Sequence, residues 1–240
     1  VSIANNHAMD YGEDALEDTI MLLDGWKIAH AGAGQSLDEA RRPARIVVEG
    51  TPVVFLAYCA WARSKMHAGE GTPGVAPIDA DAIVEDVRKA KEEEGAVVIV
   101  SLHWGIQHTD RSQPGQHAVA HAIMEAGADA ILGHHPHRPQ EIEVVGGRPV
   151  AYSLGNLVFG YMNPLYTNNV ALVLSFDGAS LVSAALVPLA GKNGRIRYRP
   201  YPLSGPDGRR LLEKIAGFSE RLGTVMDVSD SGAAIRLAAD

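Results

Sequence analysis

The feature that most constrains the fold is the alternation of apolar segments with segments of helical spacing. Ala96–Leu102 is almost continuously apolar, and Ala128–Leu132 repeats that character after the helix-patterned stretch Gln116–Ala126. A strand that is apolar on both faces is typical of a sheet covered on both sides. Helical segments that alternate with such strands predict βαβ units and a parallel sheet.

A different pattern follows residue 168. Asn169–Phe176, Leu181–Leu189 and Arg195–Leu203 are strand-like segments separated by turns that contain glycine. They predict an antiparallel meander that forms a second sheet. We therefore predict an α/β fold, a two-sheet β-sandwich flanked by helices, as one domain over residues 1–222. Its second-sheet strands lie at about 169–203, and a C-terminal tail follows at 223–240.

The composition excludes several classes of function. The 240 residues are 46% hydrophobic and carry a formal net charge of −8, whereas nucleic acids and anionic membrane surfaces require a basic face. No apolar run approaches the roughly 18 residues that span a bilayer. The single cysteine, Cys59, follows an apolar run, which predicts a core residue rather than a reactive thiol.

The first residues predict a fragment. Val1–Ala4 is an apolar, strand-like segment with neither an initiator methionine nor a charged leader before it. We therefore expect the upstream sequence, including the first strand or strands of the fold, to be missing. A mature start after processing is the alternative.

Polar residues that can bind metal follow the ends of predicted strands at four places. These places are Asn5–His7, His103–Gly105, Gly133–His137 and Ser153–Asn156. Open α/β sheets form their binding crevices at the carboxyl ends of their strands. The position of the four segments therefore predicts a common site.

Gly133–His137 gives the sharpest signal, because three of its residues are histidines. His135 and His137 flank a proline that fixes the turn, so both imidazoles can converge on one centre, and His134 precedes them. Neutral imidazole suits Zn, Fe, Mn or Ni better than Ca or Mg. A histidine-rich surface loop is the alternative. His103 alone would indicate a hydrogen-bonded core residue, but beside this second cluster it indicates a ligand.

Asn6 and His7 follow the first strand in the same way. An asparagine oxygen can bind a hard cation, and the neighbouring histidine could then act as an acid. Asp10 has two open roles, which are to accept from the His7 ring and fix its tautomer, or to cap the helix expected from Glu13. A polar turn with a chance histidine is the alternative.

Three further patterns carry less. His117 and His121 have a spacing that can bind metal, but no glutamate follows His117 and a structural role is favoured. Gly32–Gly34 lacks the full glycine pattern of a nucleotide-binding loop. For Tyr152–Asn156, a site wall that includes Asn156 and a plain strand end stay equally open.

Four ordered stretches resemble the signature sequences of the CapA family of bacterial capsule-synthesis and poly-γ-glutamate-biosynthesis proteins. The stretches are Ala4–Gly12, Ser101–Gly105, Gly133–His137 and Tyr152–Asn156, within a resemblance that runs from Val1 to about Phe159. That family is similar to the calcineurin-like metallophosphoesterases. The resemblance therefore implies a β-sandwich flanked by helices, with a dinuclear metal site at the strand ends.

The resemblance also implies a role for each matching residue. It implies four metal ligands, which are Asn6, His103, His135 and His137. His103 and His135 would share one ion, and His137 would bind the other or lie nearby. His7 would be the catalytic histidine, with Asp10 to orient it, and His134 matches a position where variation is expected. The implied cofactors are two divalent ions, either Mn, Fe or Zn.

Two departures from the family pattern matter. The superfamily draws aspartate ligands from a strand upstream of the Asn-His motif, and nothing stands before Val1 in this sequence. The chain by itself therefore implies an incomplete two-metal site. In addition, Gln107 and His108 stand where an acidic residue followed by an aromatic one is expected.

We predict a metal-dependent hydrolase of the two-metal phosphoesterase type, associated with capsule or poly-γ-glutamate biosynthesis and active only if the missing aspartates are supplied. Its substrate would be an anionic polymer or a phosphoester. The alternative is a non-catalytic accessory protein of a capsule synthesis or export machine that binds metal or polymer. The resemblance implies a capsule-synthesis membrane complex as partner, no nucleic acid, and a cell-envelope or extracytoplasmic location, with a cytoplasmic one left open.

Overall fold

The computed structural model describes residues 1–60, 64–93, 95–159, 168–191 and 198–237. The chain forms two compact units. The first comprises Val1–Trp104 and His121–Ile131, and the second comprises Gly105–Ala120 and Leu132–Asp240. The boundary falls within helix α4 (Pro114–Glu125) and within strand β6 (Ala130–His134).

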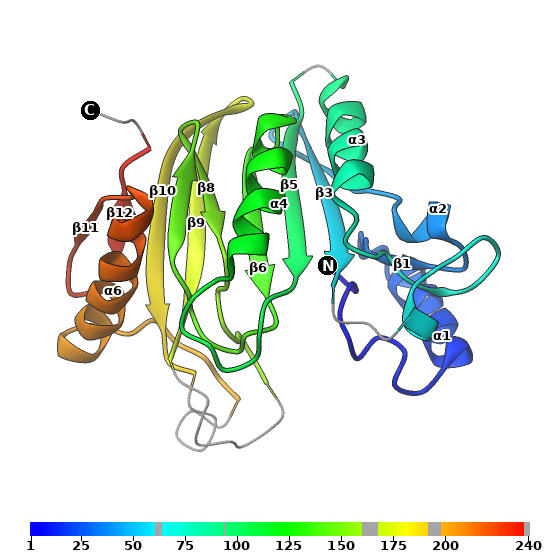
Figure 1. Cartoon of the computed structure of the whole chain (residues 1–240), viewed down its shortest axis with the longest axis horizontal. Coiled ribbons are helices and arrows are strands. Elements are labelled where there is room, and N and C mark those ends of the chain that lie inside the picture. Colours follow the sequence, from blue (N-terminus) through cyan, green and yellow to red (C-terminus); the bar gives the residue numbers. More distant parts are fainter. Residues whose placement is uncertain (61–63, 94, 160–167, 192–197, 238–240) are drawn as a thin grey trace. The chain divides into compact units, whose positions relative to one another are not determined.

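The first unit is built on three neighbouring strands (Figure 1). They are β2 (Ala44–Val48), β3 (Thr51–Cys59) and β5 (Val97–His103). Glu49 and Gly50 join β2 to β3 with positive φ at both positions, as a tight hairpin turn requires. β3 and β5 pair in parallel and end together, with Cys59 opposite His103. This parallel pair agrees with the predicted parallel sheet, and His103 lies at the carboxyl end of a buried strand.

Helices and two short strands surround this ladder. They are α1 (Glu13–Gly25), β1 (Ala33–Gly34), α2 (Leu37–Ala40), the 3₁₀ helix η1 (Ser64–Met66), β4 (Gly74–Val75) and α3 (Ala80–Lys91). Asp79 caps α3 by accepting from the Ala82 backbone N–H at 3.1 Å. The buried residues Ile83 and Val87 lie on α3, which packs against β3 and β5. The buried Cys59 fits its predicted place in the core.

Two glycines of the first unit are needed for packing. A Cβ on Gly32 would lie 2.5 Å from that of Ala4 and 2.9 Å from that of Ala57. A Cβ on Gly34 would lie 2.5 Å from that of Glu39. Close approach of the backbone therefore accounts for these glycines without a nucleotide.

The second unit contains two sheets that share one core. Its elements are β7 (Ile142–Val145), β8 (Arg148–Ala151), β9 (Asn169–Asp177), β10 (Ser180–Leu189), α6 (Pro206–Ser219), the 3₁₀ helix η2 (Glu220–Leu222), β11 (Met226–Val228) and β12 (Ala233–Ile235). The end of β6 neighbours the hairpin β8–β7, and the second sheet has the order β11-β12-β10-β9. Buried side chains of both sheets, such as Ile142 and Leu186, form one cluster with Leu212 of α6. Two sheets that pack together beside a helix agree with the sandwich that we predicted over residues 1–222.

The second sheet differs from the prediction at its third strand. Residues 198–203 form only an isolated bridge between Pro202 and Leu189, and residues 192–197 lie outside the described part of the chain. Pro200 and Pro202 lack the N–H groups that a strand ladder needs. The sheet instead takes β11 and β12 from the predicted tail, where three-residue strands are too short to show a period. No helix among the described residues is long and apolar enough to cross a membrane.

Candidate functional site

The first unit joins four of the predicted site residues in one chain of hydrogen bonds. His103 Nε2 lies 2.8 Å from Asn6 Oδ1. Asn6 Nδ2 lies 3.3 Å from His7 Nε2, and His7 Nδ1 lies 2.8 Å from Asp10 Oδ2. Residues 97 positions apart in the sequence are thus brought together at the end of β5.

The direction of each bond follows from the groups involved. A carboxylate only accepts, so His7 donates from Nδ1 to Asp10. An amide nitrogen only donates, so Nε2 of a neutral His7 accepts from Asn6. The Asn6 oxygen only accepts, so His103 donates from Nε2. The chain therefore fixes the tautomer of His7 and leaves a lone pair on its Nε2.

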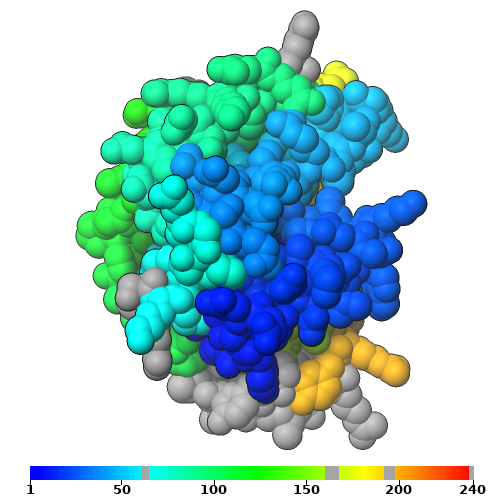
Figure 2. Space-filling view, turned by 90° about the vertical axis from the view of Figure 1, so that its right-hand side faces the viewer, coloured from blue at the N-terminus to red at the C-terminus, as the bar shows by residue number. Residues whose placement is uncertain are grey.

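The segment that carries Asn6 and His7 is a series of turns. Asn5 Oδ1 accepts from the His7 backbone N–H at 2.9 Å. Gly12 occupies the N-cap of α1 and supplies no side-chain cap, so the orienting role of Asp10 is realised and the capping role is not. The His7 and Asp10 side chains are 60% and 49% exposed. This N-terminal segment, dark blue in Figure 2, lies at the surface of the first unit and is accessible to solvent.

The second unit holds its predicted residues on an unusual backbone. A Cβ on Gly133 would lie 1.9 Å from the Tyr152 carbonyl oxygen, so only glycine permits β6 and β8 to approach. The turn that follows places His135 at φ 98° and His137 at φ 58°. Left-handed backbone costs a non-glycine residue about 1–3 kcal/mol and tends to persist at functional sites. This backbone keeps His135 and His137 as candidates for a functional role.

Hydrogen bonding also orients the His137 ring. Its Nδ1 lies 2.8 Å from Asn156 Oδ1, which only accepts, so Nδ1 carries the proton and Nε2 of the neutral ring keeps its lone pair. The ring centroid lies 6.2 Å from that of His135 and 4.7 Å from that of Phe159. The lone pair of the His137 ring therefore lies on Nε2, and Asn156 acts as the positioning residue of this ring.

Asn169 holds Asn156 in place. The Asn156 backbone N–H donates to Asn169 Oδ1 at 2.9 Å, and Asn169 is only 1% exposed. A Cβ on Gly155, whose φ is 77°, would lie 2.2 Å from that same oxygen. The glycine of the predicted motif is therefore required by the approach of Asn169. Sequence reasoning missed Asn169, because a buried asparagine at the start of a strand carries no local signal.

His108 is a second residue that sequence reasoning left unassigned. It has positive φ, 62°, and its backbone N–H donates to the Pro136 carbonyl at 2.8 Å. Its ring centroid lies 5.9 Å from that of His137. The signal was the departure from the family pattern at Gln107 and His108. A third strained histidine thus borders the Gly133–His137 turn.

His134 has a different environment from its neighbours. Burial of its ring lowers the pKa of His134 to about 4. The backbone at His134 is still part of β6, before the turn. His134 is therefore a neutral strand residue, in keeping with its lower place among the predicted ligands.

His117 has a structural setting. Its Nε2 lies 2.9 Å from Ser112 Oγ, and its Nδ1 lies 3.0 Å from the Tyr152 hydroxyl. Tyr152 is fully buried and donates to Glu143 at 2.5 Å, and burial followed by that carboxylate raises the pKa of Tyr152. Of the Tyr152–Asn156 stretch, Tyr152 thus belongs to a core network, whereas Asn156 contacts a candidate ligand.

The donor atoms suit a divalent transition metal in chemistry. Asn6 Oδ1 and His103 Nε2 lie 2.8 Å apart, so both could bind one ion once the Nε2 proton of His103 is released and the hydrogen bond between them is broken. Imidazole nitrogen with amide oxygen suits Mn, Fe or Zn. None of the predicted ligands is a carboxylate, and no three His, Cys, Asp or Glu side chains of the described residues gather closely enough to hold an ion. The first unit contains Asn6, His7, Asp10 and His103, and the second unit contains the remaining candidates.

The class of fold is metallophosphatase-like. A Staphylococcus aureus protein described as a candidate 5′-nucleotidase, solved in complex with alpha-ketoglutarate, matches with a TM-score of 0.51 at 16% identity. The match covers 88% of this chain and 40% of that chain. This similarity confirms the predicted α/β fold.

The chain belongs to the bacterial capsule synthesis protein PGA_cap family, which matches residues 1–161. The PGA biosynthesis protein CapA of Bacillus subtilis (strain 168) is 38% identical over 157 residues, 65% of this chain and 41% of the relative. The capsule biosynthesis protein CapA of Bacillus anthracis is 33% identical over 162 residues, 66% and 39% of the two chains. A probable polyglutamine synthesis accessory protein of Mycobacterium tuberculosis is 35% identical over 171 residues, 67% and 45% of the two chains.

These matches confirm the family predicted from the four motifs. The chain spans about two fifths of the length of these curated relatives.

Proposed function

We propose that this chain forms part of the metal-dependent hydrolase site of a capsule or poly-γ-glutamate biosynthesis protein, which acts on an anionic polymer or a phosphoester. One observation supports the proposal best. The hydrogen-bonded chain from His103 through Asn6 to His7 and Asp10 links a candidate ligand pair directly to a candidate acid. Family membership associates the chain with capsule synthesis.

In this proposal His7 moves the proton. Asp10 accepts from Nδ1 and stabilises the charged ring once Nε2 is protonated. Protonation of Nε2 ends its contact with the Asn6 amide nitrogen, because both groups are then donors. The proton on Nε2 is then free to pass to the leaving oxygen of the substrate.

Asn6, His103, His135 and His137 would hold divalent ions, two in number and either Mn, Fe or Zn. When bound, such ions lower the pKa of water and offset charge on the substrate oxygens. Asn156 keeps the His137 ring turned so that Nε2 is available, as outer hydrogen-bond partners of metal ligands commonly do. Left-handed backbone at His135 and His137 would keep this turn in one conformation, so that it need not become ordered when ions bind.

A second candidate function is a non-catalytic accessory role. Two observations favour it. The ligand set of the described residues lacks a three-residue His, Cys, Asp or Glu cluster, and one relative is described as a polyglutamine synthesis accessory protein. In that case the same residues would bind metal or polymer without turnover.

Metal analysis and a hydrolysis assay on the purified protein separate the two candidates. We expect Mn, Fe or Zn to co-purify and bis(p-nitrophenyl) phosphate to be hydrolysed. His7→Ala should lower turnover by about 10²–10⁴-fold with metal content unchanged, since general acid catalysis contributes an effect of that size. His121→Ala, an exchange outside the predicted ligand set, is the matched control. Bound metal without turnover would favour the accessory role, and turnover that survives His7→Ala would refute the assignment of the acid.

A further inference from the structure

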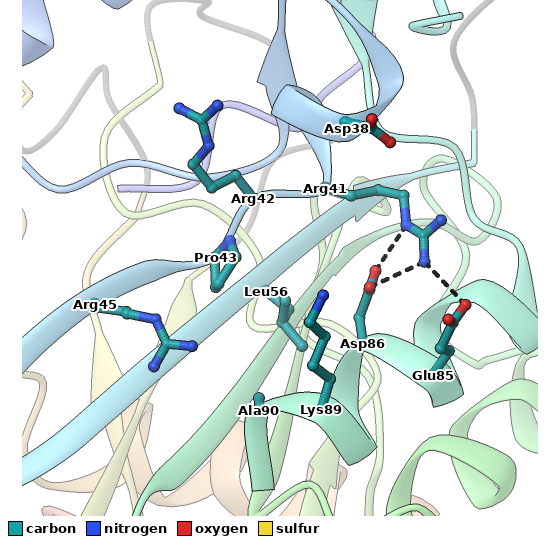
Figure 3. A pocket seen from close by; sticks show the side chains of 10 residues that line it. All are labelled: Asp38, Arg41, Arg42, Pro43, Arg45, Leu56, Glu85, Asp86, Lys89 and Ala90. Carbon is teal, nitrogen blue, oxygen red and sulfur yellow. Dashed lines mark hydrogen bonds and ion pairs between the residues drawn. The ribbon is translucent and has the colours of Figure 1, made fainter. Parts of the chain in front are cut away.

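A cavity of the first unit is lined by none of the residues discussed above as site candidates. Its volume is about 670 Å³, and it lies between the Asp38–Arg45 segment and α3 (Figure 3). Leu56 of β3, 2% exposed, lines it from the sheet. Ligand sites of proteins commonly have volumes of about 300–1,000 Å³. The cavity therefore has room for a small ligand or for part of a polymer.

The lining is more basic than the chain as a whole. Four of its residues are basic and three are acidic: Arg41, Arg42, Arg45 and Lys89 against Asp38, Glu85 and Asp86. The excess of one positive charge stands in a chain with a net charge of −8. The basic side chains of the lining can therefore attract anionic groups where they project into the cavity, and two of them, Arg42 and Arg45, also pair with Glu39 and Glu93 outside it.

Arg41 and Asp86 form a fixed wall of the cavity. Arg41 Nε lies 2.8 Å from Asp86 Oδ2, and its Nη2 lies 2.9 Å from Oδ1, while Nη2 also donates to the Ala82 carbonyl. The Tyr58 hydroxyl donates to Asp86 Oδ2 at 2.7 Å. The hydrogen bond with Asp86, against the opposing effect of burial, raises the pKa of Arg41. The pair neutralises itself and leaves ligand binding to the other cations.

Three cations are available to a ligand. Lys89 has no ion pair within the described part of the chain. Arg42 is 71% exposed and has its ion pair with Glu39 at 3.6 Å, and Arg45 pairs with the half-exposed Glu93. Exposed pairs of this kind contribute little to stability, so a ligand carboxylate can replace Glu39 or Glu93 at little cost. In Figure 3, Arg42 and Arg45 lie on the opposite side of the view from Glu85, and Lys89 is drawn between them, next to Asp86.

The arrangement favours several separate carboxylates over one compact phosphate. The three cations come from different positions around the cavity and do not meet at a point (Figure 3). Lys89 and Ala90 lie in the last turn of α3, where the helix dipole disfavours a concentrated negative charge. Asp38 and Glu85 add repulsion against a dianion. Single charges spaced along a chain can instead pair one by one with the cations.

We propose that this cavity binds a glutamate oligomer through its carboxylates, independently of metal. The choice of glutamate rests on the proposed function in poly-γ-glutamate biosynthesis. Binding here would hold a polymer on the first unit through contacts that neither His7 nor the metal ligands supply. It would serve a hydrolase and an accessory protein alike.

Calorimetric titration of the metal-free protein with a γ-linked glutamate hexamer, in excess EDTA, tests this proposal. We expect saturable binding that weakens at least tenfold in the double variant Arg42→Gln/Lys89→Gln. Each single variant should lose about 3–10-fold, and binding should weaken as salt rises. Lys65→Gln, an exposed lysine of the same unit outside the cavity, is the charge-matched control and should bind as the parent does. Circular dichroism confirms that each variant folds.

Four results would overturn the proposal. The first two are an unchanged affinity for the hexamer in the double variant and an equal loss of affinity in Lys65→Gln. The third is binding of the hexamer only when EDTA is left out. The fourth is displacement of the hexamer by inorganic phosphate at equal charge concentration. Failure of the hydrolysis assay with hexamer binding intact would refute the proposed enzyme and leave this site standing. The two proposals can therefore fail separately.

Discussion

The two units hold their candidate residues in different ways. In the first, a chain of side-chain hydrogen bonds joins His103, Asn6, His7 and Asp10. In the second, the backbone is left-handed at His135 and His137, and Asn156, which is held by the buried Asn169, orients the His137 ring. Side chains that hold one another can exchange protons and partners, whereas a strained turn keeps one geometry. From this difference we infer that proton chemistry is confined to the first set, which also offers Asn6 and His103 as ligands, and that the second set offers rigid ligands only.

The largest expected effect is on metal binding, and it tests whether both sets serve the same ions. His103→Ala and His135→Ala should each lower metal affinity by more than the about 10–100-fold that loss of an outer hydrogen-bond partner costs. The reason is that each removes a nitrogen ligand outright. Metal stoichiometry and competition with a chelator measure the effect. Loss in only one of the variants would show that only that unit supplies ligands.

Removal of the orienting partners should sharpen the contrast. Asn156→Ala should lower metal affinity by about 10–100-fold, because His137 loses the bond that fixes its ring. Asp10→Ala should leave metal affinity unchanged and lower turnover by a similar factor, because it orients an acid and not a ligand. Chelator competition and the phosphodiester assay report the two effects. If both variants changed the same quantity, the division of roles between the units would be wrong.

Paired Ala and Gly exchanges test the backbone difference directly. At His135, where φ is 98°, Gly should be more stable than Ala by about 1 kcal/mol, because only alanine retains the Cβ that disfavours left-handed backbone. At His103, within a strand, Ala should be more stable than Gly by about 0.5–1 kcal/mol. Urea unfolding of the four variants measures both differences. If the difference in stability between the glycine and alanine variants had the same sign at both positions, backbone strain would not explain how the second unit holds its histidines.

Sequence reasoning reached the parts of the site that depend on strand ends and family motifs. The buried strand before His103 and the glycine turn after β6 follow from local pattern, and the structure has both. Positive φ at His108 and the support from Asn169 could not be foreseen, because both depend on residues distant in sequence. β11 and β12 were not predicted as strands, because three residues are too few to show an alternating pattern.

The smallest expected effect concerns the ion pairs beside the strained turn. Asp110 accepts from Arg138, the residue after His137, and from Lys214 at 3.1 Å each. Burial raises the pKa of Asp110, but the hydrogen bonds from Lys214 and Arg138 outweigh it and hold that pKa below 3.8. A carboxyl group whose pKa is lowered by folding stabilises the fold above its unfolded pKa, and this contribution disappears as pH falls through the folded value.

Asp110→Asn should therefore lower the free energy of unfolding by about 0.5–1 kcal/mol near neutral pH, the modest amount expected of a partly exposed pair. The difference from the parent should shrink as the pH falls below about 4, where protonation removes the charge in the parent too. Urea unfolding across that range measures it. Asp227→Asn, which breaks an exposed pair with Arg236 in the same unit, is the control and should leave metal affinity unchanged. If metal affinity fell in Asp110→Asn alone, the ion pair between Asp110 and Arg138 would help to hold the strained histidine turn. If metal affinity were unchanged in both variants, the turn would keep its conformation without that ion pair.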